Sequence, residues 1–138
     1  MRLLACCAVL LAVSGCSLSG DDAARFRLVV PDNNIRVEGV ECAGARPFRN
    51  VHRGTRFTVE DGDGRVLADG ELPAGQAVNA DPTVDWGVER IPTYCVMEFG
   101  VDLPKRPRYR FRVDRGSPIE FDGSLVFRDE PVQITLSG

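Results

Sequence analysis

Most of the chain alternates between apolar and polar residues in short runs, and glycine, proline, aspartate or asparagine separates one run from the next. The clearest run is RYRFRVD at 108–114, in which aromatic and aliphatic residues alternate with arginines. Such period-two patterns are typical of strands with one buried face. No window after residue 24 sustains the helical i, i+3, i+4, i+7 pattern, so the sequence predicts an all-β fold. Seven or eight such runs predict a two-sheet antiparallel β-sandwich over residues 25–138.

The predicted strands are 25–30, 35–42, 55–60, 65–72, 93–103, 108–114, 124–127 and 132–136. Within 35–42 the apolar residues change from odd to even positions at Gly39, which predicts a β-bulge there. Asp61-Gly62-Asp63-Gly64 is typical of a hairpin turn, because Asp-Gly pairs tolerate positive φ. The same residues do not favour a calcium loop, because an EF-hand that began at Asp61 would have Arg65 and Val66 at its fifth and sixth positions.

The chain has five cysteines, and two of them, Cys42 and Cys95, lie in the predicted sandwich. In an oxidising compartment, a disulfide between them would close about 54 residues and stabilise the fold by ~4 kcal/mol. Cys95 shares its face of the predicted strand 93–103 with other apolar residues, so we expect the disulfide to point into the core. The alternatives are two buried free thiols, or a metal site with His52 that would offer at most three ligands and no C-x-x-C spacing.

Residues 1–15 have the three-part layout of a secretory signal peptide. Arg2 supplies a positive charge, residues 3–13 are apolar or small, and Ser14-Gly15 precedes Cys16. We expect a helix over the apolar part, although it is too short to cross a hydrocarbon core of ~30 Å.

Val13-Ser14-Gly15-Cys16 resembles the lipobox of bacterial lipoproteins. The resemblance implies cleavage before Cys16, acylation of its thiol and export to the outer face of the plasma membrane, or to the outer membrane of a cell that has one. Residues 16–24 would then form the lipidated cysteine and a polar tether. The alternative is an ordinary cleaved signal in which Cys16 has no special role. The strand layout of 25–138 is in turn similar to small Ig-like or transthyretin-like exported domains.

The connection 74–92 has no clear strand pattern, and it holds the single tryptophan, Trp86, with Asp81 and Asp85 nearby. Loops of this length are often functional in compact domains, and tryptophan is enriched at the energetic centre of interfaces. One interpretation is a loop that presents Trp86 within an acidic rim to a protein or glycan partner. The other is that Trp86 folds back and caps the open end of the core.

The formal net charge of −3 does not favour a nucleic-acid partner. One predicted strand is nevertheless basic, and its residues Arg108, Arg110 and Arg112 would share one face at intervals of about 6–7 Å. They could hold an anionic surface, either lipid headgroups or an anionic envelope polymer. The alternative is a solvated face on which they pair across strands with acids such as Glu98 or Glu120.

Few residues suggest catalysis. His52 is the only histidine and lies in a basic stretch, 46–53, that we expect to be a surface loop. The chain has no Gly-x-Ser-x-Gly elbow, and no motif for a cofactor or a metal. The sequence therefore favours a binding or cell-envelope structural module over an enzyme. The alternative is a carrier of a small apolar ligand between the two sheets, which would need a dry cavity of several hundred Å³.

Overall fold

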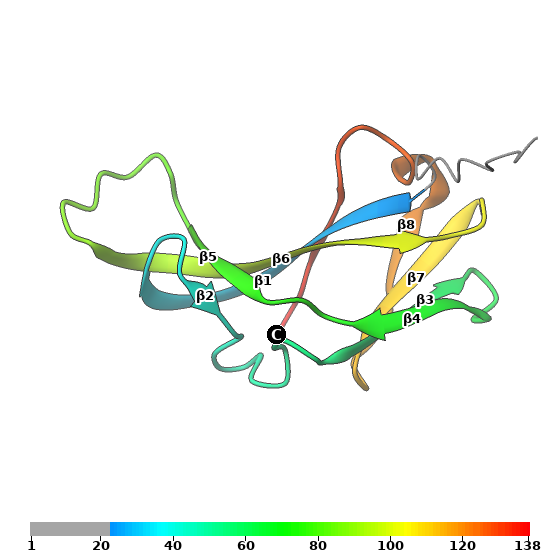
Figure 1. Ribbon diagram of the computed structural model, residues 1–138, viewed down its shortest axis with the longest axis horizontal. Coiled ribbons are helices and arrows are strands. Elements are labelled where there is room, and N and C mark those ends of the chain that lie inside the picture. The colour runs from blue at the N-terminus through cyan, green and yellow to red at the C-terminus, as the bar shows by residue number, and fades with distance from the viewer. Residues whose placement is uncertain (1–22) are drawn as a thin grey trace, which may run out of the picture.

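The computed structural model describes residues 23–138, which form two β-sheets (Figure 1). The strands are β1 (Ala23–Val37), β2 (Glu41–Cys42), β3 (Arg56–Asp61), β4 (Val66–Glu71), β5 (Gly75–Asn79), β6 (Arg90–Asp102), β7 (Arg108–Val113), β8 (Ile119–Asp122) and β9 (Val132–Thr135). A short 3₁₀ helix, η2, covers Gly123–Leu125. No helix in this part of the chain is long and apolar enough to cross a membrane.

The two sheets have the orders β2-β5-β6-β1-β9 and β4-β3-β7-β8. Every strand pair is antiparallel except β1 with β9, which run parallel from Phe26 opposite Val132 to Val29 opposite Thr135. The predicted all-β, two-sheet sandwich is therefore confirmed, with nine strands where we expected seven or eight. The predicted leader helix, Cys16 and most of the tether lie outside the described residues, while Ala23 and Ala24 belong to β1.

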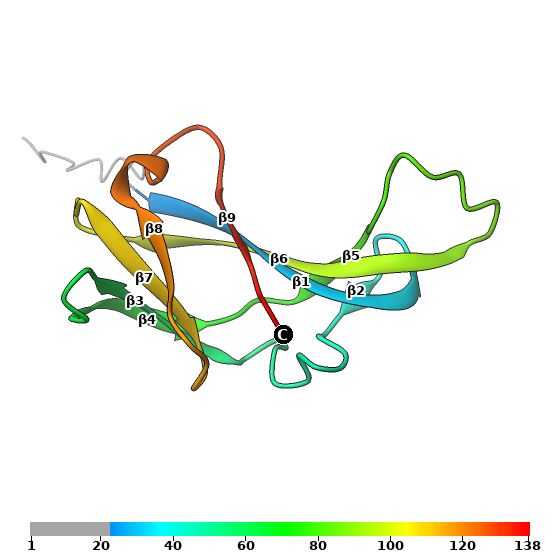
Figure 2. The same ribbon diagram turned by 180° about the vertical axis from the view of Figure 1, so that it is seen from behind.

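The longest feature of the molecule is a two-stranded ribbon formed by β1 and β6. The two strands pair from Ala23 opposite Asp102 to Val37 opposite Arg90. β1 has 15 residues, which at ~3.3 Å per residue span about 50 Å. Figures 1 and 2 show that the four-stranded sheet faces only the part of this ribbon near Ala23, and that the other part extends beyond it.

The core fills the space between the sheets at the Ala23 end of the ribbon. Phe26 and Leu28 of β1 are buried against Tyr109 and Phe111 of β7, as the alternation of both strands predicted. The rings of Phe26 and Phe111 stack with their centroids 5.9 Å apart. Tyr109 is fully buried and keeps its hydroxyl satisfied, because it donates to the Pro104 carbonyl at 2.8 Å.

The predicted bulge at Gly39 is wrong. Gly39 has φ +84° and lies in the tight turn that separates β1 from β2, so the change of apolar face marks a turn between two strands. The register shift lies earlier in β1, between Val30 and Asn34. Pro31 cannot donate a ladder hydrogen bond there, and Asn33 adopts φ +49°, both of which interrupt regular pairing.

Two further strand predictions need correction. β5 lies inside the connection 74–92, which we expected to be irregular, so the loop is shortened to 80–89. The sequence of β5, GQAVN, is short and mixes small and polar residues, so it gives no clear period-two signal. The predicted strand 124–127 is wrong because η2 and the turn that follows it occupy these residues, and the preceding residues form β8. Asp122 caps η2, accepting a hydrogen bond from the Ser124 amide at 2.7 Å.

Candidate functional site

The Cys42–Cys95 disulfide is present, as predicted, and lies in the core: Cys95 is fully buried and Cys42 is 8% exposed. It joins β2 to β6 within the five-stranded sheet and passes over the intervening strand β5 at Gly75. In antibody domains the core disulfide links the two sheets, so this bond has a different role. It fastens the edge strand β2 to the central ribbon.

A buried ion pair supports the same region, and the sequence analysis did not single it out. Asp32 and Arg36 lie 2.6 Å apart, with side chains 0% and 10% exposed. Asp32 also accepts a hydrogen bond from the Ala45 amide at 2.8 Å, and Arg36 donates to the Ala43 carbonyl at 2.8 Å. Arg36 donates in addition to Thr93 of β6. The pair therefore attaches the segment after β2 to the irregular part of β1.

Burial of Asp32 alone would raise the pKa of its carboxyl group. The hydrogen bonds from Arg36 and from the Ala45 amide, together with the positive charge of Arg36, outweigh burial and hold that pKa below its ordinary value. Asp32 is therefore ionised in the folded protein at neutral pH. The spacing of four residues could have suggested a pair, but the intervening bulge that brings the two side chains together leaves no clear sequence signal.

The loop 80–89 holds Trp86, Asp81 and Asp85 at the end of the ribbon farthest from Ala23 (Figures 1 and 2). Trp86 is half-buried and lies outside the core cluster of the described residues. Its indole N–H donates to Oδ1 of Asn79 at 3.2 Å, so the ring is folded towards the base of its own loop.

The two aspartates shape this loop by accepting hydrogen bonds. Asp81 accepts from both the amide and the hydroxyl of Thr83, at 3.0 and 2.6 Å, and Asp85 accepts from the Gly87 amide at 3.1 Å. The bonds from Thr83 hold the pKa of Asp81 below its ordinary value. Both carboxylates are at the surface, so the loop is internally braced and still acidic.

Exposed apolar side chains accompany Trp86 at this end. Val88 is 65% exposed and Val84 is 39% exposed, and Ile35 and Val40, from the end of β1 and the turn before β2, are also exposed. We call the loop 80–89 together with Ile35 and Val40 the distal tip. The backbone amide of Asn79, just before the loop, donates to the carboxylate of Glu38 at 3.4 Å. Glu38 lies between Ile35 and Val40, so this hydrogen bond links the two parts of the distal tip.

The three predicted ladder arginines lie on the outer face of the four-stranded sheet, as the alternation required, but two are neutralised within the molecule. Arg112 and Arg110 lie 3.4 and 3.9 Å from the carboxylate of Glu60, and Arg110 also lies 3.7 Å from Glu120. Arg108 is opposite Asp122 in the β7–β8 register and is exposed. For Arg110 and Arg112, the geometry favours the interpretation of cross-strand pairing.

Other residues considered from the sequence are accounted for locally. Glu98 pairs with Arg27, not with the ladder. His52 is exposed, and its Nδ1 lies 2.8 Å from the Arg53 carbonyl. Asp61 accepts from the amides of Asp63 and Arg65, which confirms the turn and lowers the pKa of Asp61. Among residues 23–138, no group of three or more His, Cys, Asp or Glu side chains is arranged to hold a metal ion.

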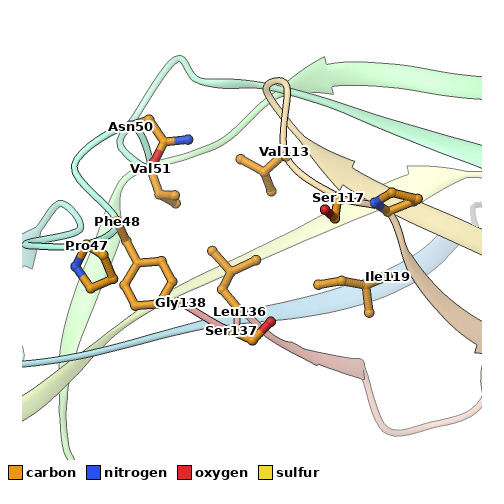
Figure 3. Close-up of a pocket in the computed structure, with 12 residues that line it drawn as sticks. Pro47, Phe48, Asn50, Val51, Val113, Ser117, Ile119, Leu136, Ser137 and Gly138 are labelled. Carbon is orange, nitrogen blue, oxygen red and sulfur yellow. The ribbon is translucent and has the colours of Figure 1, made fainter.

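A pocket of ≈ 350 Å³ opens between the two sheets, beside the β7–β8 turn and the end of β9 (Figure 3). Phe48, Val51 and Val113 are buried in it, Ile119 and Leu136 are half-buried, and exposed Asn50, Ser117 and Ser137 add polar groups. The sequence analysis missed these lining residues. The stretch 46–53 is basic in sequence, but its buried residues are the apolar Phe48 and Val51.

Over residues 23–138 the fold and these sites define an all-β domain with one disulfide inside one sheet and an acidic and apolar tip. No protein-family model, curated protein or solved structure matches the chain.

Proposed function

We propose that the protein is a membrane-anchored, extracytoplasmic binding module that uses its distal tip to contact a partner. One observation carries this proposal: the β1–β6 ribbon separates the start of the domain from the loop 80–89 by the length of β1, about 50 Å. If Cys16 is acylated, the anchor is joined to Ala23 by a short tether at the end of the ribbon opposite to the tip, which leaves the tip free to reach away from the membrane surface.

The composition of the tip supports a protein partner. Trp86 and the exposed Val84 and Val88 offer an apolar centre, which is where interface energy concentrates. Asp81, Asp85 and Glu89 make its surroundings acidic, with Arg90 as the nearest opposing charge along the chain. A partner that fits this surface has an apolar patch surrounded by basic residues. The same acidity does not suit nucleic acid.

The ladder on β7 contributes less to this proposal, because Glu60 and Glu120 already hold Arg110 and Arg112. Charges that are paired within the sheet gain little from an external anion.

The test has an anchor part and a tip part. Cells that make the protein are labelled with an alkyne-bearing palmitate, and the label is expected in the wild type and absent from Cys16→Ser. A photo-crosslinking amino acid is then placed at Val88, at the tip, or at Val66, which is 54% exposed on β4 and serves as the matched control.

We expect a discrete crosslinked product from position 88, none from position 66, and loss of the product when Trp86→Ala is added. Equal products from both positions, or a product that persists with Trp86→Ala, would contradict a role for the tip. Failure of Cys16→Ser to change the label would contradict the anchor independently.

A further inference from the structure

We infer that the inter-sheet pocket is a binding site for a small amphiphilic anion, a ligand with an apolar body and a carboxylate or similar head. This inference concerns a different part of the molecule from the distal tip and does not depend on it. The pocket is lined by residues of the segment 43–55, of the β7–β8 turn and of the end of the chain after β9. Figures 1 and 2 show that the C-terminus lies near the middle of the long axis.

The lining of the pocket is apolar where it is buried and polar where it is exposed to solvent. Phe48, Val51 and Val113 are 8% exposed or less and form its inner part. Ser117 and Ser137, labelled among the lining residues in Figure 3, are exposed and therefore belong to its solvent-facing part. At ≈ 350 Å³ it is at the lower end of the range for small-molecule sites, about 300–1,000 Å³. An apolar body buried in the inner part would gain ~25 cal/mol per Å² of apolar surface removed from water.

Three arginines flank the lining residues along the chain. Arg46, Arg49 and Arg115 are exposed, and each is bonded directly to a residue that lines the pocket. Adjacent Cα atoms are 3.8 Å apart, so each of these long side chains starts within that distance of a lining residue. Within residues 23–138, none of the three forms an ion pair with a carboxylate. They are available to the head of a ligand, and arginine suits carboxylates because its planar fork matches their geometry.

Acidic side chains near the rim are fewer. Asp114 and Glu120 are each bonded to a lining residue, but Glu120 lies 3.7 Å from Arg110 on the outer face of the sheet. Asp114 and the terminal carboxylate of Gly138, which itself lines the pocket, are left against three arginines. The rim therefore favours an anionic head over a neutral or cationic one.

The experiment compares ligands that share a tail and differ in the head. Decanoate, decanol and decyltrimethylammonium are titrated into the purified chain below their micelle-forming concentrations, with calorimetry for affinity and amide chemical shifts for location. We expect decanoate to bind roughly tenfold more tightly than either of the others. Its shifts should be confined to the segments 46–51, 113–119 and 135–138.

Two variants test the site. Ser117→Trp fills the opening and should abolish binding, whereas Ser117→Ala leaves it open and should not. Replacing Arg46, Arg49 and Arg115 together by Gln should reduce decanoate affinity to that of decanol. The matched control replaces Arg25, Arg65 and Arg106 by Gln; these arginines are also exposed but lie in other parts of the fold, and their loss should have no effect.

Each remaining outcome overturns a defined part of the inference. No binding by any of the three ligands, with the fold intact by circular dichroism, would remove the site. Equal binding by all three would remove the preference for an anion. Shifts spread over the distal tip would place the ligand elsewhere. If Ser117→Trp fails to fold, the two triple-arginine variants still distinguish these results.

Discussion

A Cβ atom added to Gly75 would lie 2.5 Å from Sγ of Cys95, so the disulfide occupies the space that a side chain at this position of β5 would need. The same position is 3.0 Å from the Cys42 carbonyl oxygen, which is backbone and cannot move aside cheaply. We expect Gly75→Ala to lower the free energy of unfolding by about 2 kcal/mol, the usual cost of overpacking a core. Denaturant titration under oxidising conditions measures this.

The matched control is Gly100→Ala on β6. An added Cβ at Gly100 meets nothing closer than the Ala24 carbonyl oxygen at 3.9 Å, which is ordinary contact. Gly100→Ala should therefore leave the unfolding midpoint nearly unchanged. Equal effects of the two substitutions would show that strand geometry, not the disulfide, determines the cost at Gly75.

The Asp32–Arg36 pair predicts an acid-sensitive part of the stability. Because the folded-state pKa of Asp32 is lowered from about 3.8, its contribution is fully present above the unfolded pKa and is lost as the pH falls through and below 4. We expect Asp32→Asn to cost about 3 kcal/mol at neutral pH, since it leaves a buried guanidinium without its counter-ion. Unfolding titrations of both proteins between neutral and acid pH should converge.

Asp69→Asn is the control for charge removal. Asp69 pairs with Arg56 at 3.1 Å, but both side chains are more than half exposed, so the loss should stay below about 1 kcal/mol. A pH dependence that is unchanged in Asp32→Asn would argue against Asp32 as the responsible group.

The single tryptophan makes the tip directly observable. Asn79→Ala removes the acceptor of the Trp86 indole N–H and of the Asp81 amide. We expect the emission maximum of Trp86 to move to longer wavelength and iodide to quench it more strongly, while the thermal midpoint changes little, because Trp86 is outside the core. A large fall of the midpoint would instead show that the loop is needed to hold the sheet.

Glu60 is the acid on which the arginine ladder depends, because it lies between Arg110 and Arg112. In a Cys16→Ser background, so that no acyl chain contributes, Glu60→Gln should release Arg112, leave Arg110 with Glu120 alone, and give measurable binding to vesicles that contain anionic lipid. We expect a stability loss of about 2 kcal/mol, because Glu60 is buried and its partners are only partly exposed. Glu130→Gln removes one exposed acid elsewhere and should not bind. Strong vesicle binding by the chain with Glu60 intact would favour the anionic-surface hypothesis for the ladder.

Period-two alternation was a reliable guide wherever a strand has one buried and one solvated face. β7, with its buried Tyr109 and Phe111, is an example, and the core position of Cys95 followed from the same logic. The sequence did not predict β5 and β8, because both are short. In β5, Gly75 also has no side chain that could contribute to the pattern, because the disulfide occupies that space.

The candidate sites were less predictable, because they are built from contacts between distant segments. Phe48 and Leu136 meet in the inter-sheet pocket although they are far apart in the chain, and neither belongs to a recognisable motif. Trp86 was identified from its residue type alone, but its bond to Asn79 depends on where β5 ends. The ladder shows the converse: its spacing was predicted correctly, but the sequence did not reveal that Glu60 and Glu120 from neighbouring strands pair with Arg110 and Arg112.

The position of β1 has a consequence for the order of assembly. The first strand of the domain pairs with β6 and β9, and β9 is the last strand of the sheet, so β1 finds both neighbours only when nearly all of the chain is present. If the protein is exported from its N-terminus, the buried residues Phe26, Leu28 and Val30 of β1 would stay unpaired until β6 has followed. Such non-local pairing slows folding and prolongs the exposure of strand edges. Chaperones that hold extended apolar segments would act on this protein through residues 24–30.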